Sequence, residues 1–218
     1  MQEAMIVKRS NSSVTLQVTI SLEGETFYSI ENNILDACNA MGRQATKEAL
    51  KQYDTNGETI VVNEKKLTAR TRSNKSYHTP YGKINLDRHV YQSSTGGKIF
   101  CPLENSAKMI NRATPRFTKM LSNKYARMNA QESGSDLMEN HGVKVSLSYL
   151  QDISEAVGAI AQSSVESWSY NIPDNIEDVA VINMSLDGAM LLTREDGYRE
   201  AMVASISLYN CSGERLHS

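Results

Sequence analysis

The spacing of the apolar residues changes along this chain of 218 residues, and each change restricts the fold. Residues 25–53 repeat apolar side chains at steps of three and four, which indicates a long amphipathic helix that Asp54-Thr55-Asn56-Gly57 ends. Residues 105–169 keep a helical spacing, whereas Val179–Asp187 alternates with the period of a strand. The sequence therefore predicts an α+β fold whose last part is a set of antiparallel strands.

Shorter segments also have strand or turn patterns. Val14–Ile20 and Lys83–Gln92 alternate between apolar and polar side chains, as half-buried strands do. Ser93–Gly97 can reverse the chain into Lys98–Cys101, which predicts a β-hairpin. The polar and basic segment Lys65–Ser76 has no such pattern and is predicted to be a loop or arm.

The helical stretch contains signals for separate helices. Thr114-Pro115 is expected to start one helix, because proline is favoured in a first turn. A second, over Ala130–Asn140, is expected to end at His141-Gly142. Ser146 is expected to cap a third that extends to Ile160. Helix, glycine turn and capped helix is the helix-turn-helix arrangement, in which the second helix can enter the major groove of DNA. An ordinary helical hairpin has the same pattern.

Basic residues are concentrated in the middle of the sequence. Between Lys65 and Gln131, fourteen Lys and Arg residues stand against two acidic residues, a net charge of +12, and the other residues carry −14. Such a segment, interleaved with Tyr and His, suits a polyanion, because cations displace phosphate counterions and rings contact sugars and bases. The alternative is that acidic residues from elsewhere in the sequence lie close to these cations in space.

Double-stranded DNA is accordingly the expected partner. The candidate contacts are basic residues in and around the helix that begins near Pro115, and solvent-side residues of the third helix. The basic candidates are Arg112, Arg116, Lys119, Lys124 and Arg127, and the candidate base readers are Ser148, Tyr149 and Gln151. Asp152 and Glu155 of the third helix would repel phosphates if they faced the duplex.

The cysteines and the apolar runs indicate the compartment. Cys38, Cys101 and Cys211 are widely spaced and odd in number, which predicts reduced thiols. Cys101 with His78 or His89 lacks the spacing and the fourth ligand of a zinc site. No apolar run approaches the roughly 18 residues of a membrane span, and the N-terminus lacks the apolar core of a secretory signal. We therefore expect a cytoplasmic protein.

Asp187 is expected at a strand end, because Gly188 follows it. Asp196-Gly197 then predicts a hairpin into a strand over Arg199–Tyr209. A carboxylate ending a central strand of an antiparallel meander is typical of ribonuclease-H-like polynucleotidyl transferases, where two or three carboxylates hold a pair of Mg²⁺ ions. The open alternative is that this aspartate only forms a turn or cap.

Several blocks of residues occur in the order found in a known family. They are Thr79-Pro80-Tyr81-Gly82, Arg88-His89-Val90-Tyr91-Gln92, Gly96-Gly97-Lys98, Cys101-Pro102-Leu103-Glu104, Glu139-Asn140-His141-Gly142, Leu186-Asp187-Gly188 and Glu195-Asp196-Gly197-Tyr198-Arg199-Glu200-Ala201-Met202-Val203. Over roughly residues 75–218 these blocks resemble the ISKra family of bacterial insertion-sequence transposases. The resemblance implies a DDE-type transposase, with Asp187 as the first catalytic carboxylate and a Mg²⁺ ligand.

The family's second and third acidic residues lie beyond the segment that matches this chain. We therefore expect three parts. They are an N-terminal strand, long helix and basic arm (1–78), a β-hairpin and helix-turn-helix-like DNA-binding region (79–172), and the first three strands of a truncated ribonuclease-H-like domain (173–218). The expected function is the DNA-binding N-terminal part of a transposase, which binds element ends but does not cut. A homodimer or another partner could complete it.

The competing hypothesis is a catalytically dead, stand-alone DNA-binding protein or repressor derived from a transposase. Both hypotheses predict that the chain binds DNA, and they differ in whether Asp187 ever serves in a metal site. A protein with no nucleic-acid role would show no retention on DNA at low salt and no steep salt dependence.

Overall fold

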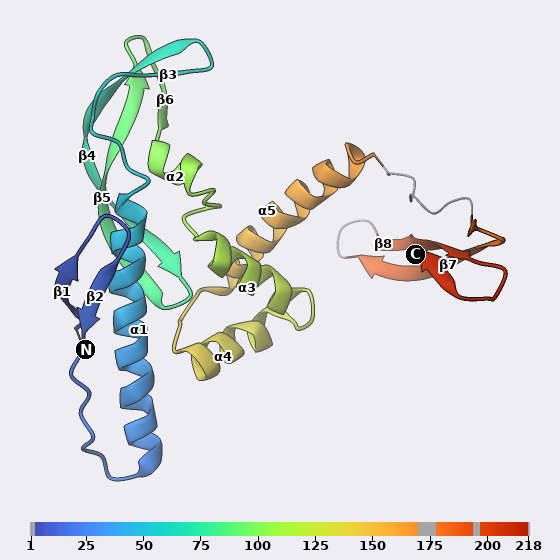
Figure 1. Ribbon diagram of the computed structural model, residues 1–218, viewed down its shortest axis with the longest axis horizontal. Coiled ribbons are helices and arrows are strands. Elements are labelled where there is room, and N and C mark those ends of the chain that lie inside the picture. Colours follow the sequence, from blue (N-terminus) through green and yellow to red (C-terminus); the bar gives the residue numbers. More distant parts are fainter. Residues whose placement is uncertain (1–2, 170–177, 194–196, 218) are drawn as a thin grey trace. The chain divides into compact units, whose positions relative to one another are not determined.

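The computed structural model describes residues 3–169, 178–193 and 197–217, and it divides into two compact units, residues 1–165 and 166–218 (Figure 1). The elements of the first unit are β1 (Met5–Arg9), β2 (Val14–Gln17), α1 (Phe27–Lys51), β3 (Ile60–Val62), β4 (Lys65–Thr79), β5 (Gly82–Ser93), β6 (Gly96–Phe100), α2 (Pro102–Ser106), α3 (Pro115–Tyr125), α4 (Ala130–His141) and α5 (Leu147–Glu166). Those of the second are β7 (Val181–Thr193), β8 (Gly197–Tyr209) and β9 (Arg215–His217). Neighbouring strands of the described sheets pair antiparallel. The presence of both helices and antiparallel sheets confirms the predicted mixture of α and β structure.

Helix α1 is the long helix that the apolar spacing predicts. It begins with a capping box, because the Thr26 side chain accepts from the backbone of Ser29 and the Ser29 side chain accepts from the backbone of Thr26. The β1–β2 hairpin lies beside the helix (Figure 1), and Arg9 Nε lies 3.0 Å from Glu48 Oε2 across this contact. Strand β1 was not predicted, because its apolar residues Met5, Ile6 and Val7 are consecutive and do not alternate with polar ones.

The larger sheet of the first unit has the order β3-β4-β5-β6. The prediction of a loop or arm over Lys65–Ser76 is wrong, because this segment lies within β4. Strand β4 pairs with β5 from Thr68 opposite Gln92 to Thr79 opposite Gly82. Much of this strand is exposed and most of its residues are polar, so its sequence lacks the regular alternation of a half-buried strand. The expected boundary at residue 78 therefore falls inside a strand, and the residues on both sides of it share one unit.

Two groups of buried side chains hold the first unit together. The sheet core joins α1, β4, β5 and the start of α2, and the helical core joins α3, α4 and α5. The sheet core consists of Leu50, Tyr77, Ile84, Leu86, Cys101 and Leu103. The helical core consists of Ala113, Phe117, Leu121, Leu137, Val143, Tyr149, Leu150 and Ile153.

The second unit is a meander of β7, β8 and β9. Strand β7 continues through Asp187 to Thr193, which pairs with Gly197, while Asp196 of the predicted hairpin turn lies outside the described residues. Cross-strand pairing places a row of apolar side chains on one face, each more than half exposed. They are Ile182, Met184, Leu186, Met190, Leu192, Tyr198, Met202 and Ile206. Among the helices described, none combines the length and apolarity that a membrane crossing requires.

Candidate nucleic-acid interface

The helices α4 and α5 follow one another as the sequence predicts. Gly142 ends α4 in a left-handed conformation with φ of 63°, which L-residues other than glycine and asparagine rarely adopt. Ser146 precedes α5, and its hydroxyl accepts from the backbone N–H of Tyr149 at 3.3 Å while its carbonyl accepts from Leu150. The helix, glycine turn and capped helix are therefore present.

Helix α3 carries exposed cations on the side opposite its buried residues. Phe117 and Leu121 are fully buried in the helical core. Arg116 and Lys119 are three residues apart and exposed, and Arg127 is exposed in the turn just after the helix. In the described part of the chain, no ion pair involves any of these three cations. We call Arg116, Lys119 and Arg127 the α3 basic surface.

Arg112 lies in the loop that leads into α3, and backbone contacts hold this loop in place. Its φ of 68° is left-handed, and that of Asn111 is 44°. The N–H of His78 donates to the Arg112 carbonyl at 2.8 Å, and the Tyr149 hydroxyl donates to the Asn111 carbonyl at 2.9 Å. A left-handed non-glycine residue costs roughly 1–2 kcal/mol, so β4 and α5 fix the exposed Arg112 in a conformation that it would not adopt alone.

Other cations of the basic segment are neutralised by acidic residues distant in sequence. Lys124 forms an ion pair and hydrogen bond with Asp136 of α4. The hydrogen bond from Lys124, and after it a second hydrogen bond from Asn140, lower the pKa of the Asp136 carboxyl group. Lys124, one of the predicted DNA contacts, is thus engaged within the protein. For Lys124 the alternative interpretation holds, in which an acidic residue from elsewhere in the sequence lies close to the cation in space.

Glu104, in the first turn of α2, neutralises two more cations. Its Oε1 accepts from Tyr77 Oη at 2.7 Å, and it lies 3.0 Å from Lys75 Nζ and 3.4 Å from Arg88 Nε. Burial alone would raise the pKa of Glu104, but the hydrogen bonds from Tyr77 and Lys75 and the positive charges of Lys75 and Arg88 together lower it. Arg88 is buried and donates to the Ser73 carbonyl. These side chains stabilise the sheet core.

One of the three predicted base readers is placed wrongly by the sequence. The Tyr149 side chain is not on the solvent side of α5, because it is buried in the helical core with its ring 4.2 Å from that of His78. Ser148 is exposed and Gln151 is partly buried. Ser148, Asp152 and Glu155 recur at steps of four and three residues, so the exposed face that includes Ser148 also carries two carboxylates.

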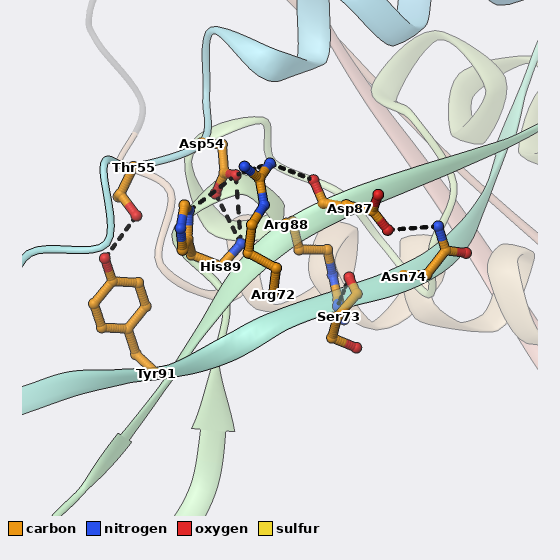
Figure 2. A network of polar contacts seen from close by, with 9 residues as sticks. All are labelled: Asp54, Thr55, Arg72, Ser73, Asn74, Asp87, Arg88, His89 and Tyr91. Carbon is orange, nitrogen blue, oxygen red and sulfur yellow. Dashed lines mark hydrogen bonds and ion pairs between the residues drawn. The ribbon is translucent and has the colours of Figure 1, made fainter.

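Figure 2 shows a polar network that links the end of α1 to the sheet. The Asp54 carboxylate accepts from the backbone N–H of His89 at 3.1 Å, and its Oδ2 lies 3.2 Å from His89 Nδ1. Arg72 Nη2 lies 3.7 Å from the same oxygen. Thr55 Oγ1 and Tyr91 Oη are 2.6 Å apart. The loop after α1 is thus fixed to β4 and β5 by side chains.

An aspartate beside a histidine is also the arrangement of a general base, and here the Asp54 carboxylate accepts from the backbone N–H of His89 as well, which joins the pair to the sheet. Gly57 lies near the second ring nitrogen, because a Cβ built there would be 3.2 Å from His89 Nε2. His78 and Cys101 belong to separate buried groups, and among the residues that the structure describes no three His, Cys, Asp or Glu side chains come together. The contacts of Asp54 with His89 fix the loop after α1 to β5.

The prediction that Asp187 ends a strand is wrong, because Asp187 lies in the middle of β7. It pairs with Val203 of β8, its side chain is exposed, and its Oδ1 accepts from the backbone N–H of Gly188 at 2.9 Å. The neighbouring pairs on the same face are Ser185 with Ser205 and Ala189 with Ala201. Glu200 pairs with Met190 and lies on the opposite face of the hairpin. A pair of Mg²⁺ ions needs two or three carboxylates, so the described residues around Asp187 do not fit one.

A cavity of about 570 Å³ lies between α1, the turn from β4 to β5 and the turn from α4 to α5. Its charged lining residues are Asp36, Arg43, Lys83 and Lys144. Sequence reasoning missed this cavity, because these residues come from three distant segments and no spacing signal connects them.

Comparison with known protein families and with curated proteins finds no match to this chain.

Proposed function

We propose that this chain binds double-stranded DNA through the α3 basic surface, as the DNA-binding part of a transposase of the kind that its sequence blocks resemble. The observation that carries the proposal is the position of Arg116, Lys119 and Arg127. They are exposed, they have no acidic partner among the described residues, and they lie opposite the buried side of α3. Cations placed in this way can each displace a counterion from a phosphate.

The proposal assigns the phosphate contacts to α3 rather than to α5. The exposed face of α5 presents Asp152 and Glu155, which repel phosphates, and Leu147–Glu166 contains no Lys or Arg. Arg112, held at the entry to α3, extends the positive charge toward the sheet. The ion pair between Lys124 and Asp136 serves to join α3 to α4.

The experiment that tests this proposal is a DNA titration at several salt concentrations, followed by fluorescence anisotropy of a labelled duplex. The test variant is R116Q/K119Q/R127Q. Each lost phosphate contact should reduce the slope of log affinity against log salt by about 0.9, so the slope should fall by about 2.7. The matched control is K65Q/K66Q/K98Q, which removes the same charge from exposed positions on strands.

The control variant should change the slope by less than about 0.9, which is the value for one phosphate contact. Equal losses in the two triple variants would show that binding reflects total charge and not the α3 basic surface. A wild-type protein that does not bind the duplex at low salt would reject DNA binding itself.

The second candidate function is a stand-alone DNA-binding protein. The surroundings of Asp187 favour it, since Ser185, Ser205 and Val203 near this carboxylate offer no second acidic ligand. The antiparallel meander of β7, β8 and β9 is the order in which a ribonuclease-H-like domain would begin, which favours the transposase. Translation of the DNA beyond codon 218 separates the two candidates: further strands with acidic residues support the transposase, and unrelated sequence supports the stand-alone protein.

A further inference from the structure

The cavity between α1 and the two turns collects charges from three separate segments of the first unit. Arg43 and Asp36 come from α1, Lys83 from the start of β5, and Lys144 from the turn between α4 and α5. No ion pair in the described ranges includes any of these four side chains. Three cations therefore meet one carboxylate around a single cavity, which leaves an excess of positive charge.

Direct contacts hold the walls of this cavity together. Arg43 Nη1 donates to the Tyr81 carbonyl at 3.0 Å, which fixes the guanidinium against the turn from β4 to β5. The buried side chain of Asn39 donates to the His141 carbonyl at 2.9 Å, which fixes the end of α4 to α1. A guanidinium has five N–H donors, so the contact with Tyr81 leaves Arg43 donors for a ligand. The cavity is thus formed before a ligand arrives.

The start of α5 adds to the positive potential. Ser146, directly before this helix of 20 residues, also lines the cavity. The Ser146 hydroxyl accepts from the backbone N–H of Tyr149, and the dipole of the helix favours an anion at this end. This dipole supplements the three cations.

We propose that this cavity binds a phosphate group of a nucleic-acid backbone, with Arg43, Lys83 and Lys144 as the cationic contacts. Its volume of about 570 Å³ lies within the roughly 300–1,000 Å³ of pockets for organic ligands. It can therefore admit a sugar-phosphate unit and not only a small ion. The proposal rests on the proposed DNA binding for the source of the phosphate, while the chemistry of the cavity applies equally to a free phosphate group.

The first arm of the test uses inorganic phosphate and follows the amide resonances of Gly142, Lys144 and Ser146 by NMR. We expect a saturable shift in the wild-type protein. K144Q should weaken phosphate binding about tenfold, in line with the loss of a hydrogen bond to a charged group. D36N should strengthen it, because it removes the one opposing carboxylate. The control K98Q, on an exposed strand outside the cavity, should leave the affinity unchanged.

The control K98Q separates a site in the cavity from general electrostatic attraction, since it removes the same charge as K144Q from a position outside the cavity. The opposite signs of K144Q and D36N separate a site from misfolding, which would weaken phosphate binding in both variants. Absence of a shift, or changes of the same sign in the two variants, would overturn the cavity assignment. This arm uses no DNA, so it can fail while the α3 basic surface still binds DNA, and it can succeed if the α3 proposal fails.

The second arm uses duplex DNA and identifies the source of the phosphate. K144Q should reduce the salt slope of DNA binding by about 0.9, the value for one phosphate contact. If inorganic phosphate binds the cavity but K144Q leaves the slope of DNA binding unchanged, the ligand is a free phosphate-bearing molecule, and the nucleic-acid part of the proposal is wrong.

Discussion

His78 connects the sheet to the helices through an uncharged ring. Its imidazole stacks on Tyr149, with ring centroids 4.2 Å apart, and lies parallel to Phe117 at 6.3 Å. Burial, and then the positive charges of Lys83 and Arg112, lower the pKa of His78 to about 4. The neutral ring can therefore remain buried at pH 7 without a counterion.

This lowered pKa predicts that acid destabilises the first unit. Because the unfolded His78 titrates near 6.5 and the folded one near 4, the unfolded state alone gains a proton between these values. The free energy of unfolding should thus be highest above pH 6.5 and fall with decreasing pH, by at most about 1.4 kcal/mol per unit. Urea unfolding followed by circular dichroism measures this. H78F should fall less steeply over the same range, and equal pH dependence in the two proteins would contradict the prediction.

Gly142 is required by its backbone and by its neighbour. Its φ is 63°, and an added Cβ would lie 3.3 Å from Asn39 Nδ2. G142A should therefore lower the free energy of unfolding by about 1–2 kcal/mol. G158A is the matched control, because Gly158 lies within α5 with open space around it, and alanine there should raise stability by about 1 kcal/mol. Urea unfolding compares the two, and a neutral G142A would refute the argument.

At the scale of elements, sequence predicts best where one strong period is combined with a clear end. Helix α1 repeats apolar residues and is followed by a glycine-containing turn, so its bounds agree with the prediction within two residues. Strand β4 is not predictable in this way, because much of it remains exposed and polar. Tyr149 shows a further limit: its burial depends on His78, 71 positions earlier, and no local pattern records that contact.

The position of Asp187 on β7 leads to a prediction about chemistry. The side chain is exposed, and its Oδ1 accepts a hydrogen bond from the backbone N–H of Gly188, a role that an asparagine oxygen can also fill. D187N should therefore change the free energy of unfolding by less than about 0.5 kcal/mol and leave DNA affinity unaltered. Neither protein should cleave duplex DNA in the presence of Mg²⁺. Gel assays of a labelled duplex test this, and cleavage by the wild type that D187N abolishes would contradict it.

At the scale of the whole molecule, the basic segment of the sequence does not become one uniformly basic surface. Acidic residues outside it neutralise Arg72 and Lys124, and Glu104 within it neutralises Lys75 and Arg88. The sequence could indicate an excess of charge but not which cations remain unpaired, because pairing depends on contacts between distant segments. The cavity around Arg43 was unpredictable for the same reason.

The contact between Asn39 and the His141 carbonyl joins residues 102 positions apart. A ribosome adds about 5–20 residues per second, so α1 leaves the exit tunnel roughly 5–20 seconds before the end of α4 does. During this interval the Asn39 side chain lacks this acceptor. Synthesis speed between these two points, rather than the intrinsic rate of helix formation, therefore sets the earliest time at which the first unit can close.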